Sequence, residues 1–370
     1  MPAPAYLDYN ATAPLRPAVR EALLAALDTL GNPSSPHGFG RRARALVEAA
    51  RARLADFAVA PGSGVVFTAG ASEANNLALK GLPAAAIAVS AGEHPSVLAA
   101  APEAERLPLD GEGRLDLQAL AAWLQRAPRP ALVALQAANN ETGVIQPLME
   151  AAAQVRGAGG WLHVDAVQAA GRLPAADWAP AADSLALSAH KLGGPQGVGA
   201  LVLRRETPLT AQLTGGGQER RRRAGTEAVA LIAAFGAALD EAARLQPAET
   251  LRLSALRQRL EQGLGALDTA VVVFGAGAER LSNTTCFALP GTRAETFLIA
   301  LDLEGVAVSS GSACSSGKVE GSHVLAATGV APELAAAALR ISTGWDSRPE
   351  HVDRFLAAAA AHLRRLGRAA

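Results

Sequence analysis

Ser184–Leu203, which reads SLALSAHKLGGPQGVGALVL, is the stretch from which the rest of the chain can be interpreted. Its first apolar run ends at His190 and Lys191, a glycine-rich turn follows, and a second apolar run covers residues 198–203. Two short apolar runs on either side of Gly and Pro residues predict two strands joined by a loop. A histidine and a lysine therefore end a buried strand, where a lysine is costly unless its amine is used.

Lysine is rare in this chain, which sets Lys191 apart. Of the 34 basic residues only Lys80, Lys191 and Lys318 are lysines, so arginine supplies nearly all of the solvated positive charge. Most lysines are solvated surface residues, but the apolar, glycine-rich surroundings of Lys191 do not fit that role. A desolvated lysine has a lowered pKa and can form a Schiff base with a carbonyl cofactor. That chemistry is our hypothesis for Lys191.

Length and composition narrow the class of protein. The 370 residues suffice for two lobes, because single cores stop growing near about 250–300 residues. The formal net charge is zero, which favours neither a nucleic-acid nor a membrane-surface partner. No apolar run reaches the roughly 20 residues that span a bilayer, and the first ten residues lack the pattern of a secretory signal. With two cysteines and no metal-ligand spacing, we expect a cytoplasmic protein without a metal.

Strands alternate with helices through the first two thirds of the chain. Predicted strands cover residues 65–68, 86–90, 131–137, 161–164 and 184–189. Such alternation indicates an α/β fold with a mostly parallel sheet. Polar residues follow the end of every one of these strands, and in open α/β sheets ligands bind outside the carboxyl ends of the strands. The sequence therefore predicts a ligand site at this edge of the sheet.

The remaining third predicts a second, smaller α+β lobe. Its expected elements are a helix over about residues 226–264, strands near 270–274, 284–288 and 306–309, and a final helix over 348–366. We expect a large cofactor-binding domain over residues 15–250. Residues 1–14 and 251–370 would then form the small domain.

Several polar groups at the strand ends match one cofactor. Gly70–Ser72 lies between a strand and a helix, where free backbone N–H groups and the Ser72 hydroxyl favour an anion, although an ordinary helix cap is the commoner reading of such a turn. Asp165 could cap a helix or pair with a protonated ring nitrogen, and Gln168 could donate to a ring oxygen. His94 could lie against the ring, or cap its loop. With Lys191, these groups are what pyridoxal phosphate requires.

The two cysteines differ in their surroundings. Cys286, between Thr285 and Phe287, fits a buried small hydrophobe. Cys314 lies in SSGSACSSG, a run of small and polar residues that predicts an exposed, mobile loop and a nucleophilic or redox-active thiol. Arg340 is a charge within the apolar strand ALRIS, and such an arginine is best paired with a carboxylate in a bidentate contact.

Taken together, SAHKLGGPQG, ANNETG, HVDAVQ, GGGQERRRRAGT and SSGSACSSG, in register from LDYNATAP to LRISTGW, resemble a cysteine desulfurase. This is the NifS/IscS-like branch of the class V aminotransferases, pyridoxal-phosphate enzymes of fold type I. The resemblance implies an enzyme that converts L-cysteine to L-alanine, forms a persulfide on Cys314 and passes the sulfur to an acceptor or an iron–sulfur scaffold protein. It also implies a homodimer.

The resemblance assigns a role to each candidate residue. Lys191 would bind the cofactor covalently, His94 would stack on its ring and assist proton transfer, and Cys314 would attack the substrate sulfur. Arg340 would bind the substrate carboxylate, with Asn140 beside it. The other cofactor-binding positions implied are Asp165 at the ring nitrogen, Asn140 and Gln168 at the ring oxygen, Ala71, Ser72, Ser188 and His190 at the phosphate, and Thr226 reaching the phosphate from the second subunit.

The sequence departs from the family pattern in three places. Ser72 stands where a threonine is usual, which keeps the hydroxyl. The run Arg220–Arg223 is more basic than usual and would form a solvated face or line the cleft. The tail after the final helix is short, which leaves the identity of the acceptor protein open. A selenocysteine lyase or another class V aminotransferase is the alternative within the fold. A non-catalytic thiol redox sensor is the alternative outside it, and it would give Asp165 and Arg340 no shared purpose.

Overall fold

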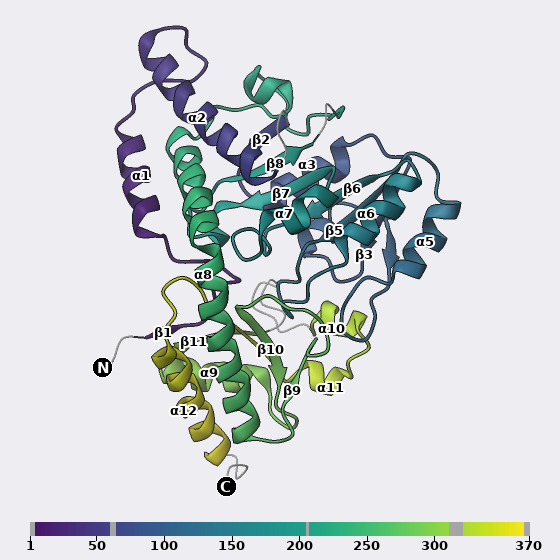
Figure 1. The fold of residues 1–370 in the computed structure, drawn as a ribbon, viewed down its shortest axis with the longest axis vertical. Coiled ribbons are helices and arrows are strands. Elements are labelled where there is room, and N and C mark those ends of the chain that lie inside the picture. The colour runs from purple at the N-terminus through teal and green to yellow at the C-terminus, as the bar shows by residue number, and fades with distance from the viewer. Residues whose placement is uncertain (1–3, 60–63, 205–206, 311–320, 366–370) are drawn as a thin grey trace.

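The computed structural model describes residues 4–59, 64–204, 207–310 and 321–365, which form two lobes joined by one long helix (Figure 1). The larger lobe is built on a seven-stranded sheet. Its strands, in spatial order, are β2 (Gly64–Thr68), β8 (Gly199–Leu203), β7 (Ser184–Ser188), β6 (Trp161–Asp165), β5 (Ala131–Gln136), β3 (Ala86–Ser90) and β4 (Glu105–Leu107). Only β8 runs antiparallel to its neighbours within this sheet, so the predicted mostly parallel sheet is confirmed.

Both faces of the central part of this sheet are buried, which explains why a strand such as β5 is apolar throughout rather than alternating. In β5, Val133 and Leu135 pack into a core on one face, while Leu132 and Ala134 pack into a second core on the other. The helices of this lobe are α1 (Pro17–Leu27), α2 (Gly38–Phe57), α3 (Ala71–Gly81), α4 (Pro95–Leu98), α5 (Leu117–Arg126), α6 (Leu148–Gly157), α7 (Ala175–Trp178) and the first half of α8 (Val229–Leu267).

The smaller lobe is α+β. An antiparallel sheet holds β12 (Ser309–Ser310), β13 (Ala338–Ser342), β10 (Thr284–Ala288) and β9 (Val272–Val273), and β1 (Ala5–Tyr6) pairs in parallel with β11 (Val306–Ala307). Its helices are α9 (Ala294–Leu303), α10 (His323–Ala327), α11 (Pro332–Ala335) and α12 (Pro349–Arg365). The N-terminal arm therefore joins the small lobe through β1.

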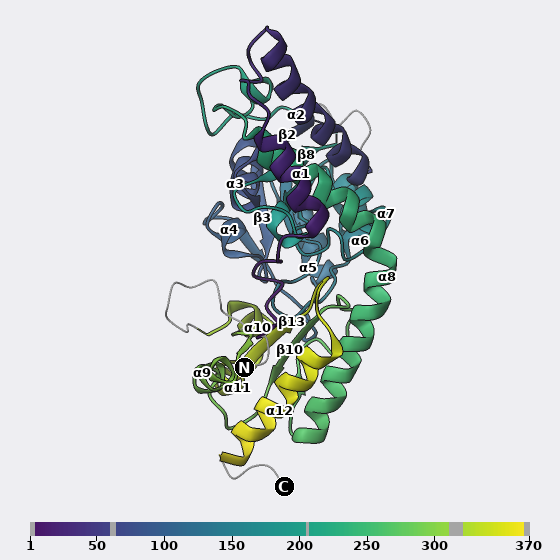
Figure 2. The same cartoon turned by 90° about the vertical axis from the view of Figure 1, so that its left-hand side faces the viewer.

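Helix α8 belongs to both lobes, as Figure 2 shows from the side. Ile232 to Ala242 pack into the core of the large lobe, and Leu253 to Leu264 pack into the core of the small one. A domain boundary at residue 250 falls between these two groups. We propose that boundary, with residues 1–14 counted in the small domain.

The structure corrects several predicted bounds. The two strands predicted around the glycine-rich turn are found as β7 and β8, but β7 ends at Ser188 and Ala189–Lys191 forms the short 3₁₀ helix η2. Helix α8 begins at Val229 and not near residue 226, and the single strand predicted over 306–309 is two strands that pair with different partners. Strand β4 was missed because its sequence, Glu-Arg-Leu, has two exposed charged residues and forms the polar edge of the sheet.

Candidate active site

A cavity of about 810 Å³ opens at the carboxyl edge of the parallel strands, between the two lobes. It brings together candidates that come from strand ends far apart in sequence, as the sequence predicts. The predicted residues that line it are Ala71, Ser72, His94, Asn140, Asp165, Gln168, Ser188, His190, Lys191 and Arg340. Thr226 is exposed and is not among the described residues that line it, and Cys314 lies outside the described residues.

Lys191 is held by the N-terminal arm. Its Nζ donates to the backbone carbonyls of Asn10 at 2.5 Å and Ala11 at 2.8 Å. The preceding residue, His190, contacts Thr12 Oγ1 at 3.2 Å, and burial together with the neighbouring Lys191 charge lowers its pKa to about 4. His190 is therefore neutral at pH 7.

The turn before α3 is shaped as an anion site. No side chain caps this helix at Gly70, while Glu73 accepts from the Ala69 N–H at 2.7 Å and pairs with Arg223. Backbone N–H groups at the helix start thus face the cavity at the positive end of the helix. Strand β8 presses on this turn: a Cβ on Gly199 would lie 2.7 Å from the Gly70 Cα, so only glycine fits there.

Asp165 and His94 are oriented by buried partners. Asp165 accepts from the Val167 N–H at 3.1 Å and from Asn75 Nδ2 at 2.8 Å, and Asn75 is in turn held by His163. His94 caps α4 by accepting from the Ser96 N–H at 3.1 Å, and it lines the cavity as well. Burial lowers the pKa of His94 despite the Asp165 charge, so the ring is neutral near pH 7. His94 is thus a helix cap that also lines the cavity, and its contact with a cofactor ring stays a prediction.

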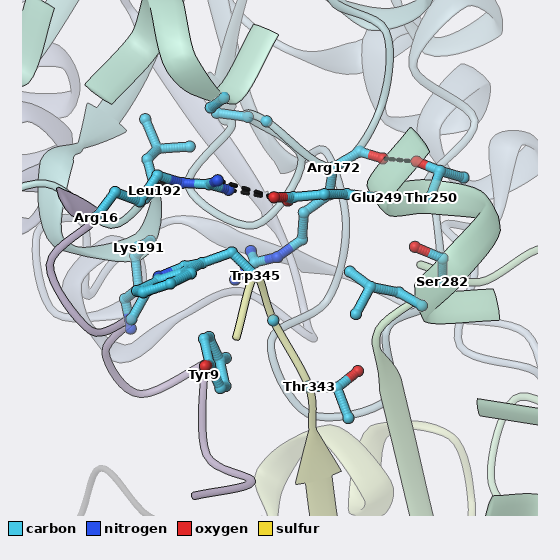
Figure 3. A pocket seen from close by; sticks show the side chains of 16 residues that line it. Tyr9, Arg16, Arg172, Lys191, Leu192, Glu249, Thr250, Ser282, Thr343 and Trp345 are labelled. Atoms are coloured by element: carbon cyan, nitrogen blue, oxygen red, sulfur yellow. Dashed lines mark hydrogen bonds and ion pairs between the residues drawn. The ribbon is translucent and has the colours of Figure 1, made fainter. Parts of the chain in front are cut away.

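Gln168 has a fixed amide orientation. Arg172 Nη1 donates to Gln168 Oε1 at 2.5 Å, and because a guanidinium only donates, the other end of the amide is the N–H group. That Nε2 donates to the Asn10 carbonyl at 3.2 Å, and Gln168 lines the large cavity. Figure 3 shows Arg172 and Lys191 among the residues that line a second, smaller cavity.

Arg340 reaches the cavity from β13 of the small lobe. Its side chain is only 3% exposed, Nη2 donates to Asp8 at 2.6 Å and Nη1 to the Asn140 carbonyl at 3.0 Å. The buried Nε has no hydrogen-bond partner among the described residues. An arginine with a spare buried donor beside an open cavity is suited to a carboxylate ligand.

Sequence reasoning missed three residues that organise this site. Asn10 links both lobes, because its side chain bonds Thr284, Asn283 and the Asn140 carbonyl. Asn75 lies in the first turns of α3, and a single polar residue on an otherwise apolar helix face was its only signal. Glu141 accepts from Ser322 Oγ at 2.5 Å and so ties the large lobe to α10.

The arginine run 220–223 does not line the cavity. Arg220 and Arg221 are exposed, in η3 (Gln218–Arg221), and Arg223 pairs with Glu73. Glu219, just before the run, is buried and pairs with Arg51 at 2.8 Å. The run therefore presents a solvated face and, through Arg223, an ion pair to α3.

The donors around the cavity fit pyridoxal phosphate. The phosphate matches the start of α3, the ring nitrogen matches Asp165, and the aldehyde matches Lys191, all at one sheet edge. The spare Nε of Arg340 leaves a donor for a carboxylate next to them. Among the described residues, no group of three His, Cys, Asp or Glu side chains is placed to hold a metal ion. No described helix is long and apolar enough to cross a bilayer.

The fold and this donor set define the class of pyridoxal-phosphate enzymes of fold type I. Residues 5–355 match the family model of the class V aminotransferases. The cysteine desulfurase of Cereibacter sphaeroides is 42% identical and covers 95% of this chain and 93% of its own length. The cysteine desulfurase IscS of Dictyoglomus turgidum is 39% identical, covering 95% and 92%.

A solved structure agrees with the sequence relatives. The X-ray structure of a NifS-like protein from Rickettsia africae is 32% identical, with a TM-score of 0.88 over 97% of this chain and 99% of that one. The chain therefore belongs to the class V aminotransferase family, and within it to the NifS/IscS-like cysteine desulfurases. This family depends on pyridoxal phosphate.

Proposed function

We propose that this enzyme converts L-cysteine to L-alanine and carries the sulfur away as a persulfide on Cys314. The observation that supports it most directly is the meeting of Lys191, Asp165 and the start of α3 at one cavity, with Arg340 facing them from the other lobe. The desulfurase names of the relatives support the choice of substrate.

Seven other residues would hold the cofactor around Lys191. Lys191 would bind it covalently through Nζ, and Asp165 would pair with the ring nitrogen. The phosphate would lie against Ala71, Ser72, Ser188 and His190, and the ring oxygen against Asn140 and Gln168. When bound, pyridoxal phosphate supplies an electron sink for the substrate's Cα–H and Cβ–S bonds. The protein would supply orientation and protonation.

The substrate would be oriented by its carboxylate. Arg340 would bind it with the guanidinium fork, including the spare Nε, with the Asn140 backbone beside it. The amine of Lys191 would take the Cα proton. His94, neutral and facing the cavity, would move further protons.

Cys314 would complete the reaction. Its thiolate attacks the substrate sulfur, an S–S bond forms, and the substrate's Cβ–S bond breaks. The electron pair of that bond is protonated at Cβ, which gives alanine, and the sulfur stays on Cys314 as a persulfide. No external oxidant is needed, because Cβ is reduced by two electrons as the two sulfurs are oxidised. An acceptor or iron–sulfur scaffold protein then takes the sulfur. We propose further that the enzyme is a cytoplasmic homodimer in which Thr226 reaches the partner's phosphate site.

The test is release of sulfide and alanine from L-cysteine with a reductant, in wild type, Lys191→Ala and Cys314→Ser. We expect Lys191→Ala to lose the absorbance of covalently bound cofactor and all turnover, while Cys314→Ser keeps the colour and loses turnover. Normal turnover by Cys314→Ser would favour a selenocysteine lyase or another aminotransferase. A wild type that binds no pyridoxal phosphate would favour the redox sensor.

A further inference from the structure

We propose that Arg172 is a positioning residue that keeps the N–H end of the Gln168 amide turned toward the cofactor's ring oxygen. None of the roles assigned above involves Arg172. It lines the smaller cavity, to which Lys191 also contributes (Figure 3). The inference rests on the proposed function, because it concerns how Gln168 meets the bound cofactor.

Arg172 is an arginine in an unusual position. Among the described residues it forms no direct ion pair, and the charges that act on it are those of Arg16, Arg340 and Glu249. Burial and the Arg340 charge lower its pKa to about 10 although the Glu249 charge opposes them, so the site is unfavourable for a positive charge. A charge held there without a direct ion pair needs another explanation.

Its hydrogen bonds supply that explanation. One nitrogen, Nη1, donates both to the backbone carbonyl of Gln168 at 2.9 Å and to the side-chain Oε1 of the same residue at 2.5 Å. Both contacts are to one residue four positions earlier. Because every guanidinium N–H is a donor, Oε1 must be the atom that faces Arg172.

The consequence lies at the other end of the amide. With Oε1 held, Nε2 faces the Asn10 carbonyl and the large cavity, and it has a second hydrogen for a ligand oxygen. Without Arg172 the amide can rotate and present Oε1 to the cavity. A negatively charged ring oxygen would then lose a donor and meet a carbonyl.

This predicts a spectroscopic effect that is separate from turnover. A donor to the ring oxygen draws negative charge from it and makes the protonated nitrogen that joins Lys191 to the cofactor less stable. Loss of the donor should raise the pKa of the bound chromophore by about one pH unit, which is tenfold in the protonation equilibrium. Absorbance between pH 6 and 10 measures this value in the resting enzyme.

The experiment is a double-mutant cycle of Arg172→Met and Gln168→Ala on this chromophore pKa. We expect each single variant to raise it by about one pH unit, and Arg172→Met to add nothing in the Gln168→Ala background. Arg172→Lys, which still only donates, should restore most of the wild-type value. A merely structural role would change the thermal midpoint and leave the pH titration in place.

Two outcomes would contradict the proposal in different ways. If Arg172→Met raises the pKa equally with and without Gln168, the effect is the loss of a positive charge and not of the amide orientation. If Arg172→Met has no effect while Gln168→Ala does, the amide keeps its orientation alone. If Gln168→Ala itself has no effect, the proposed placement of the cofactor is wrong, and the failure lies with the proposed function.

Discussion

Lys191 stands between two cavities that the chain builds in opposite ways. The one in front has a volume of about 810 Å³; among the described residues no side chain caps the start of α3 there, and Arg340 Nε has no hydrogen-bond partner. The one behind has a volume of about 30 Å³, room for a water, and there Arg16 pairs with Glu249. The first is a ligand site and the second is a joint between the lobes.

The joint, formed by Arg16 with Glu249 and the Leu192 carbonyl, explains why a glycine follows Leu192. Arg16 donates to both carboxylate oxygens of Glu249 at 2.8 Å, and its Nε donates to the Leu192 carbonyl (Figure 3). Gly193 has φ of +83°, and a Cβ there would lie 2.6 Å from Arg16 Cγ. The glycine-rich turn therefore serves the joint, while the lysine before it serves the cavity.

Breaking the joint should give the largest effect on stability. Arg16→Met would leave the Glu249 carboxylate, 15% exposed, without its partner, and we expect the free energy of unfolding to fall by about 3 kcal/mol. Urea unfolding of the cofactor-free protein measures it. The control is Arg244→Met on α8, the helix that also carries Glu249. It breaks an exposed ion pair with Glu241 and should lower the free energy of unfolding by at most about 0.5 kcal/mol. Equal losses for both variants would mean that Arg16 adds no more than a surface ion pair.

Substituting a residue of the large cavity should lower catalysis and leave the Arg16–Glu249 ion pair in place. Arg340→Met removes a charged fork for the substrate carboxylate, and we expect kcat/KM for L-cysteine to fall about 100-fold, mostly through KM. Arg340→Lys keeps the charge but not the fork and should recover only part of the loss.

The matched control for Arg340 is its protein partner. Asp8→Asn breaks the 2.6 Å ion pair and leaves the guanidinium in the cavity. We expect kcat/KM for this variant to stay within about threefold of wild type, because the carboxylate-binding group remains. If Asp8→Asn loses as much as Arg340→Met, the arginine is structural and another group binds the substrate.

The sequence predicted the cavity better than the joint, for a physical reason. Strand ends are readable from apolar runs, and the parallel topology alone brings residues such as Asp165 and Lys191 to one edge. The partners of Arg16 and Arg172 depend on how α8 and the turn after β6 pack. No local pattern encodes that packing.

Local patterns also explain why some strand bounds were predicted correctly while Asn10 was missed. The strand predicted over 86–90 is found as β3, because apolar residues flanked by polar ones mark it. Asn10 was missed because its contacts are to residues at 140, 283 and 284, far along the chain, and its own segment has no periodic pattern. Polar contacts between residues far apart in the chain cannot be predicted from a single sequence.

A last prediction concerns a contact between the lobes on the cavity side. Burial raises the pKa of Glu141 to about 7, although Ser322 donates to it and Arg340 lies near. The folded protein therefore binds more protons than the unfolded chain between about pH 4.5 and 7, so this group makes the free energy of unfolding fall as pH rises through that window.

Glu141→Gln keeps an acceptor for Ser322 and removes the titration. We expect this variant to match wild type at pH 5 and to be more stable on the order of 1 kcal/mol at pH 8, measured by urea unfolding at both values. If the Glu141→Gln protein keeps the pH dependence of wild type, this carboxyl is ionised in the folded protein at both pH values, and its contact with Ser322 does not change with pH.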